Sequence, residues 1–195
     1  MSLATYFEDL HAAPDPFGYR GSWYEQRKRQ LLLACLPQAH YARGWELGCS
    51  SGVLTAELAA RCTRLLATDL SANAVAQARR AVAGLAHVEV RQARHPGQWP
   101  DGRFDLVVCS EMAYYLAPDD LPALRAGLHA ALAGEGLLVA CHWRVPFAQA
   151  GCSAAAVHAC LGDGLHELFI YRDDDFVLQG WARAPASVAA REGLR

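Results

Sequence analysis

Apolar residues in this chain gather in short runs, and segments of helical period separate most of these runs. A run of strand length that is apolar almost throughout is typical of a strand buried on both faces of a parallel sheet. The clearest example is Phe104 to Ser110, which we therefore place near the centre of a sheet. The other runs predicted to be parallel strands are 43–47, 64–69, 87–92 and 137–143.

Three helices are predicted between these strands. The first covers Val53 to Arg61, and the second covers 72–83. Ser71 is a good N-cap for the second helix, and Gly84 is a suitable residue to close it.

The third helix begins at Pro118, Asp119 and Asp120 and ends at Gly134. The two acidic residues at its start favour a helix N-terminus, because they interact well with the helix dipole. Its buried face is marked by leucines at helical spacing, namely Leu121, Leu124, Leu128 and Leu132.

The pattern changes near the end of the chain. Runs over 165–171 and 176–182 are joined only by 172–175, a connection that can close an antiparallel hairpin but cannot hold a crossover helix. We therefore predict an α/β fold, a Rossmann-like three-layer sandwich whose seven-stranded, mostly parallel sheet ends in an antiparallel hairpin. No linker or repeat divides the chain, so residues 1–195 are predicted to form one domain.

Composition fits a compact enzyme, with 53% hydrophobic and 19% charged residues. The net charge of -2 gives no electrostatic reason to expect binding to nucleic acid or to an anionic membrane. The start of the chain carries Glu8 and Asp9 and does not read as a secretion signal, and no run is long enough to span a membrane. The seven scattered cysteines form no C-x-x-C pair. We expect reduced core cysteines in a cytoplasmic, metal-independent protein; the oligomeric state stays open.

The connection after the first strand has the composition of a ligand-binding turn. Gly48 and Gly52 allow a sharp turn and a close approach of a ligand to the main chain. The second strand then ends in Asp69, whose carboxylate can accept hydrogen bonds from ribose hydroxyls, unless it serves only to cap the following helix. The two glycines are one residue closer than the outer glycines of a dinucleotide fingerprint. With the final hairpin, this spacing argues against a nicotinamide-dependent oxidoreductase.

The ordered series Glu46-x-Gly48-Cys49-x-x-Gly52, Asp69, Ser110 and a final hairpin resembles the class I S-adenosylmethionine-dependent methyltransferases. The resemblance covers 41–183, the predicted cofactor-binding core. It implies S-adenosylmethionine as cofactor and S-adenosylhomocysteine as product. Glu46 is expected to orient the glycine turn or to meet the methionyl end through water, the alternative being a surface acid at a strand end. The implied cofactor contacts are Trp23, Tyr24, Arg27, Glu46, Gly48, Cys49, Ser50, Gly52, Asp69, Leu70, Ser110, Glu111 and Met112.

Further motifs look like those of the NodS-type nodulation methyltransferases. They are Asp15-Pro16-Phe17, Ser22 to Lys28, Gly48-Cys49-Ser50, Ser110 to Leu116 and His142-Trp143-Arg144. Members of that family N-methylate the free amine of a de-N-acetylated chitin-type oligosaccharide. The resemblance therefore implies an amino-sugar or oligosaccharide acceptor.

The chain departs from the wider class at one position. Many class I methyltransferases have an acid after the third strand that holds the adenine amino group, but this place reads Gln92-Ala93-Arg94-His95. Main-chain groups or Gln92 are the substitutes that the sequence offers.

The loop after the fourth strand contains the leading catalytic candidates. An ammonium acceptor must reach the methyl group neutral, so we expect Glu111 to bind or deprotonate it, with Tyr114 and Tyr115 shaping the pocket. His142 is the second candidate base, because histidine titrates near neutral pH, although a histidine beside Trp143 can equally be a core residue. The residues expected to meet the acceptor are Tyr114, Tyr115, His142, Trp143 and Arg144.

Residues 1–40 are expected to form a helical segment that caps the core. Trp23 and Tyr24 precede the apolar run 31–33, and Arg27 or Lys28 is a candidate partner for the methionyl carboxylate. The alternative for Lys28 and Arg29 is a solvated basic helix face. The acidic run 173–175 reads as a turn exposed to water.

The sequence thus predicts an S-adenosylmethionine-dependent methyltransferase that acts on an amino sugar or a chitin-type oligosaccharide. Two alternatives remain: N- or O-methylation of another small polar metabolite, and a cofactor-binding module without catalysis.

Overall fold

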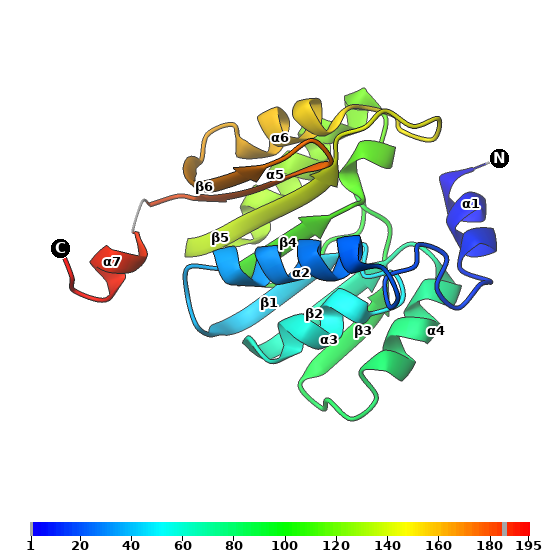
Figure 1. Ribbon diagram of the computed structural model, residues 1–195, viewed down its shortest axis with the longest axis horizontal. Helices are drawn as coiled ribbons and strands as arrows, with labels where there is room; N and C mark the ends of the chain where they lie inside the picture. The colour runs from blue at the N-terminus through cyan, green and yellow to red at the C-terminus, as the bar shows by residue number, and fades with distance from the viewer. Residues whose placement is uncertain (1, 185–186) are drawn as a thin grey trace.

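The computed structural model describes residues 2–184 and 187–195 and contains a sheet of seven strands in the order β3-β2-β1-β4-β5-β7-β6 (Figure 1). The strands β1 to β5 pair in parallel, whereas β7 runs antiparallel to β5 and to β6. The predicted fold class and the final hairpin are therefore confirmed. The strands are β1 Tyr41–Leu47, β2 Cys62–Asp69, β3 Val88–Gln92, β4 Phe104–Ser110, β5 Leu132–Trp143, β6 His166–Arg172 and β7 Phe176–Ala182.

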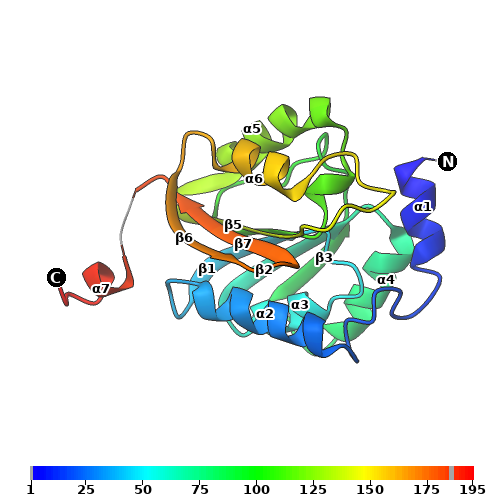
Figure 2. The ribbon, with the colours of Figure 1, turned by 45° about the horizontal axis from the view of Figure 1, so that its top comes forward.

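Helices cover both faces of this sheet, as Figures 1 and 2 show. On one face α2 (Trp23–Cys35), α3 (Val53–Ala59) and α4 (Ala72–Ala81) pack on apolar residues such as Leu65 and Val139. On the other face α5 (Leu121–Ala131) and α6 (Ala154–Gly162) pack on Trp45 and Val107. The sheet is thus the middle layer of the predicted sandwich. The remaining helical elements are α1 (Leu3–Leu10), η1 (Ala113–Tyr115), η2 (Pro118–Asp120) and α7 (Val188–Arg191).

Most predicted boundaries hold within a few residues, but the end of the third predicted helix was wrong. Helix α5 stops at Ala131, and Gly134 lies inside β5. Leu132 is buried as expected, but it pairs with Phe104 as the first residue of the strand. The register then shifts, and regular pairing resumes at Leu106 with Leu137. Pro118 to Asp120 form a turn of 3-10 helix before α5 begins, whereas Ser71 caps α4 as predicted, since its Oγ accepts the N–H of Ala74 at 3.0 Å.

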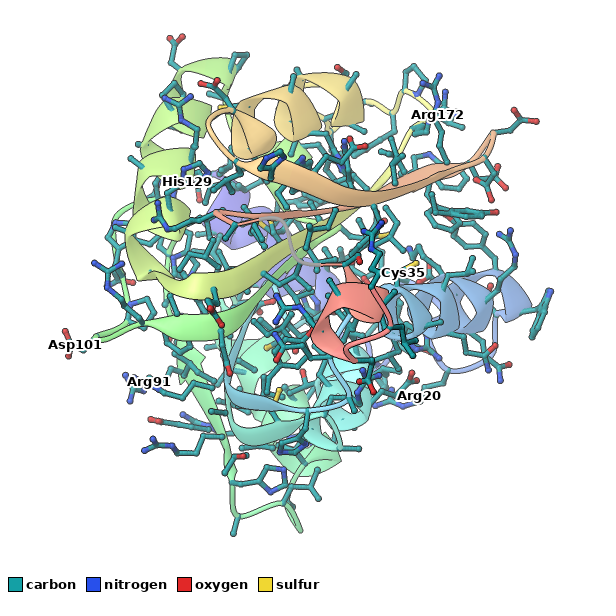
Figure 3. The ribbon with its side chains drawn as sticks, turned by 90° about the vertical axis from the view of Figure 1, so that its left-hand side faces the viewer. Arg20, Cys35, Arg91, Asp101, His129 and Arg172 are labelled. Atoms are coloured by element: carbon teal, nitrogen blue, oxygen red, sulfur yellow. The ribbon has the colours of Figure 1, made fainter. Side chains whose placement is uncertain are left out.

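All seven cysteines are free thiols, and four of them are buried, as predicted for core residues. The charged side chains of Arg91, Asp101 and Arg172 are exposed and point outward in Figure 3. Among residues 2–184 and 187–195, no helix is long and apolar enough to cross a membrane.

The sheet order creates a natural ligand position. Strands β1 and β4 are neighbours, while the chain leaves β1 toward β2 on one side and continues from β4 to β5 on the other. Open parallel sheets bind ligands at such a switch point, outside the carboxyl ends of the strands. Gly48, Asp69 and Ser110 follow or end β1, β2 and β4, so the topology brings these predicted residues to one edge.

The N-terminal segment lies against this same edge. In Figure 1, α1 stands beside α4 at the side of the sheet where the strands end. The Glu8 carboxylate accepts the hydroxyl proton of Ser71 at 2.7 Å, and the amide of Gln77 donates to the main-chain oxygens of His11 and Ala13 at 2.7 and 2.9 Å. These contacts fix the first residues over the entrance to the switch point.

Candidate active site

A cavity of about 380 Å³ opens at the carboxyl edge of β1, β2 and β4. Helix α1, the loop after it, the start of α2 and the loop after β4 complete its wall. The predicted residues that line it are Tyr24, Gly48, Ser50, Asp69, Leu70, Ser110, Glu111, Met112, Tyr114, Tyr115 and Trp143.

The glycine turn after β1 is shaped by close packing. Gly48 has a φ of +71°, and a Cβ there would lie 2.9 Å from the Cβ of Met112. Ser50 also has a left-handed φ of 47°, which is unusual for a residue with a side chain. Gly52 has a φ of +78°, as the predicted sharp turn requires. A Cβ there would lie 2.7 Å from the Cα of Ala78, so this glycine also lets α3 and α4 approach, and it does not line the cavity.

Asp69 ends β2 on the cavity wall and is 7% exposed. Its Oδ2 accepts the N–H of Ser50 at 2.8 Å, and its Oδ1 accepts the N–H of Ser71 at 2.9 Å. Burial raises its pKa above the usual value, although these two N–H groups oppose the rise. Each carboxylate oxygen keeps a further lone pair for a ligand hydroxyl. Asp69 therefore ties the glycine turn to the start of α4, while Ser71 fills the capping role that was the alternative for Asp69.

Glu46 is buried within β1, which excludes the surface position that the sequence left open. The Thr55 hydroxyl donates to its Oε2 at 2.6 Å, and the side chain borders a small cavity of about 40 Å³ next to Cys49 and Lys28. Burial raises the pKa of Glu46 from 4.5 to about 8, against the effect of the Thr55 hydrogen bond. The carboxyl group is therefore mainly protonated at neutral pH.

The raised pKa of Glu46 predicts a pH-dependent stability. Below pH 4.5 the group is protonated in both the folded and the unfolded chain, and between pH 4.5 and about 8 only the unfolded chain releases the proton. The free energy of unfolding should thus fall across this window by up to about 5 kcal/mol from this group. Glu46→Gln should remove that fall, so urea unfolding should find the variant more stable than the wild type at pH 8 but not at pH 5. If the free energy of unfolding depended on pH in the same way in both proteins, Glu46 would not be the group with the raised pKa.

Glu111 lies at the start of the loop after β4 in a strained conformation. Its φ is 55°, and its N–H donates to the carbonyl oxygen of Cys141 at 2.8 Å. Its Oε2 accepts the hydroxyl of Tyr114 and lies 3.4 Å from the main-chain N of Trp143, while its Oε1 is 3.2 Å from the Nζ of Lys28. A non-glycine residue held in this region is typical of functional sites, where the surroundings compensate for the strain. These contacts fix the carboxylate at the cavity wall.

Lys28 and Arg29 do not form the solvated basic face that was one alternative. Lys28 is 5% exposed, and its Nζ lies 2.9 Å from Oε1 of Glu25 in addition to its contact with Glu111. Burial lowers the pKa of Lys28, but the two carboxylates raise it more, so the net shift is upward and the amine stays charged. Arg29 is also buried and pairs with Glu57 at 2.8 Å. The lysine thus brings a fixed positive charge to the cavity.

Glu25 is a cavity residue that the sequence reasoning missed. Burial raises its pKa, and Lys28 opposes this shift. Its spacing of three residues from Lys28, followed by buried Leu32, was the available signal, because residues at this spacing share a helix face. Phe7, His11, Phe17 and Tyr19 also line the cavity and were missed.

His142 lies behind the cavity, so the prediction of a catalytic base and acceptor contact there was wrong. Its side chain is 0% exposed; its Nε2 accepts the N–H of Ala113 at 3.3 Å, and its Nδ1 lies 3.0 Å from Nε2 of His158. Nδ1 of His158 is 2.9 Å from Oε1 of Gln179. Only one arrangement of protons satisfies all three of these hydrogen bonds: each histidine ring donates from Nδ1 and accepts at Nε2. Burial lowers the pKa of both histidines, that of His158 to about 4, so both rings are neutral and support the loop.

Three other predicted contacts lie away from the cavity. Trp23 is 66% exposed. Arg27 donates to Asp173 at 3.0 Å and to the hydroxyl of Tyr171, and Arg144 donates to the main-chain oxygen of Asp173. Asp173 is therefore not a plain exposed turn, since it holds both arginines and accepts the N–H groups of residues 175 and 176. Arg27 thus ties α2 to the final hairpin, and Arg144 ties the end of β5 to it.

The residues at the switch point fit S-adenosylmethionine. The main chain at Gly48 leaves room that a side chain would fill, Asp69 keeps acceptor capacity beside the turn, and Leu70 offers an apolar surface for a base. The ammonium group of Lys28 also lies on the cavity wall, where it pairs with Glu111 at 3.2 Å. Within residues 2–184 and 187–195, no group of histidine, cysteine and acidic side chains has the arrangement of a metal site.

Comparisons with known proteins define the same class. The sequence family described as a methyltransferase domain matches residues 45–136. A crystal structure of a protein from Pseudomonas syringae, described as a methyltransferase, is 46% identical and covers 83% of this chain and 100% of that one, with a TM-score of 0.74. The chain therefore belongs to the methyltransferase family, and its cofactor is S-adenosylmethionine, as predicted.

Within this family the chain is similar to the nodulation proteins S. The protein from Sinorhizobium fredii is 33% identical over 124 residues, which are 60% of this chain and 54% of that protein. The aligned region thus spans about half the length of the curated relative. The structure of N-methyltransferase NodS from Bradyrhizobium japonicum WM9 with S-adenosylhomocysteine shares the fold, with a TM-score of 0.85 at 24% identity over 91% of this chain and 96% of that one.

Proposed function

We propose that this protein transfers the methyl group of S-adenosylmethionine to the free amine of an amino sugar or a de-N-acetylated chitin-type oligosaccharide. The observation that supports this most directly is the Glu111 carboxylate, held at the cavity wall by Lys28 and Tyr114. The name of the structural relative, an N-methyltransferase, agrees with an amine acceptor.

The charges around Glu111 suit a cationic acceptor. Lys28 lies between the carboxylates of Glu25 and Glu111, so this trio has a net charge of about −1 when both acids are ionised. An ammonium group is attracted to such a site but has no lone pair with which to react. Glu111 binds it and accepts its proton, while the Tyr114 hydroxyl, whose pKa burial raises, keeps its own proton and orients the carboxylate.

The aromatic walls suit a sugar. Tyr115, Trp143 and Phe147 line the cavity beside Glu111, and Tyr115 and Phe147 contact each other with ring centroids 5.5 Å apart. Rings of this kind pack against the apolar faces of a pyranose and exclude water from the reacting groups. When bound, S-adenosylmethionine supplies an electrophilic methyl group on a sulfonium. Gly48, Asp69 and Leu70 would hold its nucleoside and methionyl parts, and such fixed placement of the two reactants is a main source of rate enhancement.

A methyl-transfer assay with matched acceptors tests the proposal. Chitin oligomers with a terminal free amine should be methylated, and the same oligomers fully N-acetylated should not, because the acetamide nitrogen is neither basic nor attracted to Glu111. Fragmentation of the product in a mass spectrometer should place the methyl group on nitrogen. Methylation on oxygen, or turnover only with smaller polar amines in the same panel, would contradict the proposed acceptor and favour the alternative of another small metabolite.

A further inference from the structure

The loop after β3 carries a buried histidine on the cavity wall where the wider class has an acid for the adenine amino group. His95 is 7% exposed and lines the cavity together with Leu70 and Ala93. Its ring packs against two tryptophans, with centroids 5.3 Å from Trp45 and 5.5 Å from Trp99. This packing leaves the imidazole little freedom to turn.

One nitrogen of this ring is occupied and the other is not. Nε2 of His95 lies 3.1 Å from the Oγ1 of Thr68, whereas Nδ1 is buried and has no hydrogen-bond partner. The Thr68 hydroxyl lies 3.2 Å from the main-chain oxygen of Glu46, which can only accept, and it receives the indole N–H of Trp45 at 3.1 Å. With the hydroxyl proton directed to Glu46, the proton of His95 is on Nε2, and Nδ1 carries a free lone pair.

The ring also stays neutral under ordinary conditions. Burial lowers the pKa of His95 from 6.5 to about 4. A buried acceptor without a partner costs free energy, and in native proteins such an atom calls for a partner that binds there.

The side chain of Gln92, one of the substitutes that the sequence offered, does not reach this position. The amide of Gln92 donates to the main-chain oxygen of Leu70 at 3.0 Å, and its side chain is exposed. Gln92 and Arg94 are both absent from the cavity wall. Of these three side chains, that of His95 belongs to the cavity wall and has a ring nitrogen without a hydrogen-bond partner.

We propose that Nδ1 of His95 accepts a hydrogen bond from the exocyclic amino group of the cofactor's adenine, in place of the missing acid. Adenine then lies between Leu70 and Ala93, with its amino group toward His95 and its ribose toward Asp69. The contact selects a 6-amino purine. In a 6-oxo purine the oxygen is an acceptor, and it would face Nδ1 of His95, which is also an acceptor. This proposal rests on the cofactor of the proposed function but not on the methyl acceptor.

Two substitutions separate the two nitrogens of His95. His95→Gln can keep the contact with Thr68 but removes the acceptor at Nδ1, whereas His95→Asn keeps an oxygen near Nδ1 and loses the contact with Thr68. The ligands are S-adenosylhomocysteine and its 6-desamino analogue, in which purine replaces adenine. Calorimetric titration gives each dissociation constant, and thermal unfolding confirms that both variants are folded.

We expect S-adenosylhomocysteine to bind His95→Gln about tenfold more weakly than the wild type, and His95→Asn within about threefold of it. The desamino analogue should bind the wild type about tenfold more weakly and lose nothing further in His95→Gln, since the two changes remove the same hydrogen bond.

The proposed contact would be overturned if His95→Gln bound S-adenosylhomocysteine as tightly as the wild type does. It would also be overturned if the loss of affinity from the desamino ligand and the loss from the substitution multiplied in the combined experiment. Either result would leave the proposed function intact. Wild-type protein that binds no S-adenosylhomocysteine would overturn both. Cofactor binding as expected without methylation of any amine would refute the proposed acceptor alone.

Discussion

Replacing Glu111 by glutamine should lower kcat by about 100-fold or more with an amine acceptor. Glutamine keeps the shape and can still accept the hydrogen bond from Tyr114, but it can neither attract an ammonium group nor take its proton. Binding of S-adenosylhomocysteine should change little, because Glu111 acts on the acceptor. Steady-state methyl transfer at saturating cofactor, together with a titration of the product, measures the two effects separately.

The matched control is Glu57→Gln. Glu57 forms an ion pair with Arg29 at 2.8 Å outside the cavity wall, so its substitution removes a comparable charge pair without touching the site. Turnover of this control should stay near that of the wild type. If Glu111→Gln retains both turnover and acceptor affinity, Glu111 has no part in the reaction.

Asp69→Ala should weaken binding of S-adenosylhomocysteine by about 100-fold or more. Two effects combine, because the ribose loses its acceptor and the N–H groups of Ser50 and Ser71 lose the carboxylate that holds the turn. The free energy of unfolding should also fall by about 1–3 kcal/mol. Calorimetric titration and urea unfolding test the two parts.

Asp105→Ala distinguishes a damaged turn from a lost ligand contact. Asp105 accepts the N–H groups of Ala42 and Arg43, each at 2.7 Å, near the start of β1 and away from the cavity. Its substitution should destabilise the protein to a similar extent and leave binding unchanged. Equal loss of binding in both variants would remove Asp69 from the cofactor site.

Local patterns were enough to predict the order of the strands along the chain and the final hairpin. The apolar run of β4 is typical of a buried strand, and the 172–175 connection is too short for anything but a hairpin. The structure has the strand and the hairpin that these two patterns predicted. The end of α5 was misplaced because the burial of Leu132 is equally consistent with a helix face and with the first residue of a strand. Periodicity identifies a buried position but does not identify the partner that buries it.

The sequence placed residues on the cavity wall most reliably where they lie at the end of a strand. Asp69 ends a strand, Gly48 and Glu111 each come directly after one, and all three line the cavity. His142 also ends a strand, but His158 of α6 and Ala113 of the neighbouring loop enclose it, and contacts between distant segments leave no local signal. The same reason explains why the aromatic residues near α1 were missed.

The reversed direction of β7 affects the order in which the molecule is assembled. Because β7 runs against β5, the turn before it lies beside Trp143, at the carboxyl edge of the parallel strands. Asp173 of this turn holds Arg27, the neighbour of Lys28 on α2. Synthesis proceeds from the N-terminus, so α2 leaves the ribosome long before its anchor does. A nascent chain arrested before β7 would already carry the glycine turn, Asp69 and the pair of Arg29 with Glu57, but α2 would still lack its contact with the final hairpin.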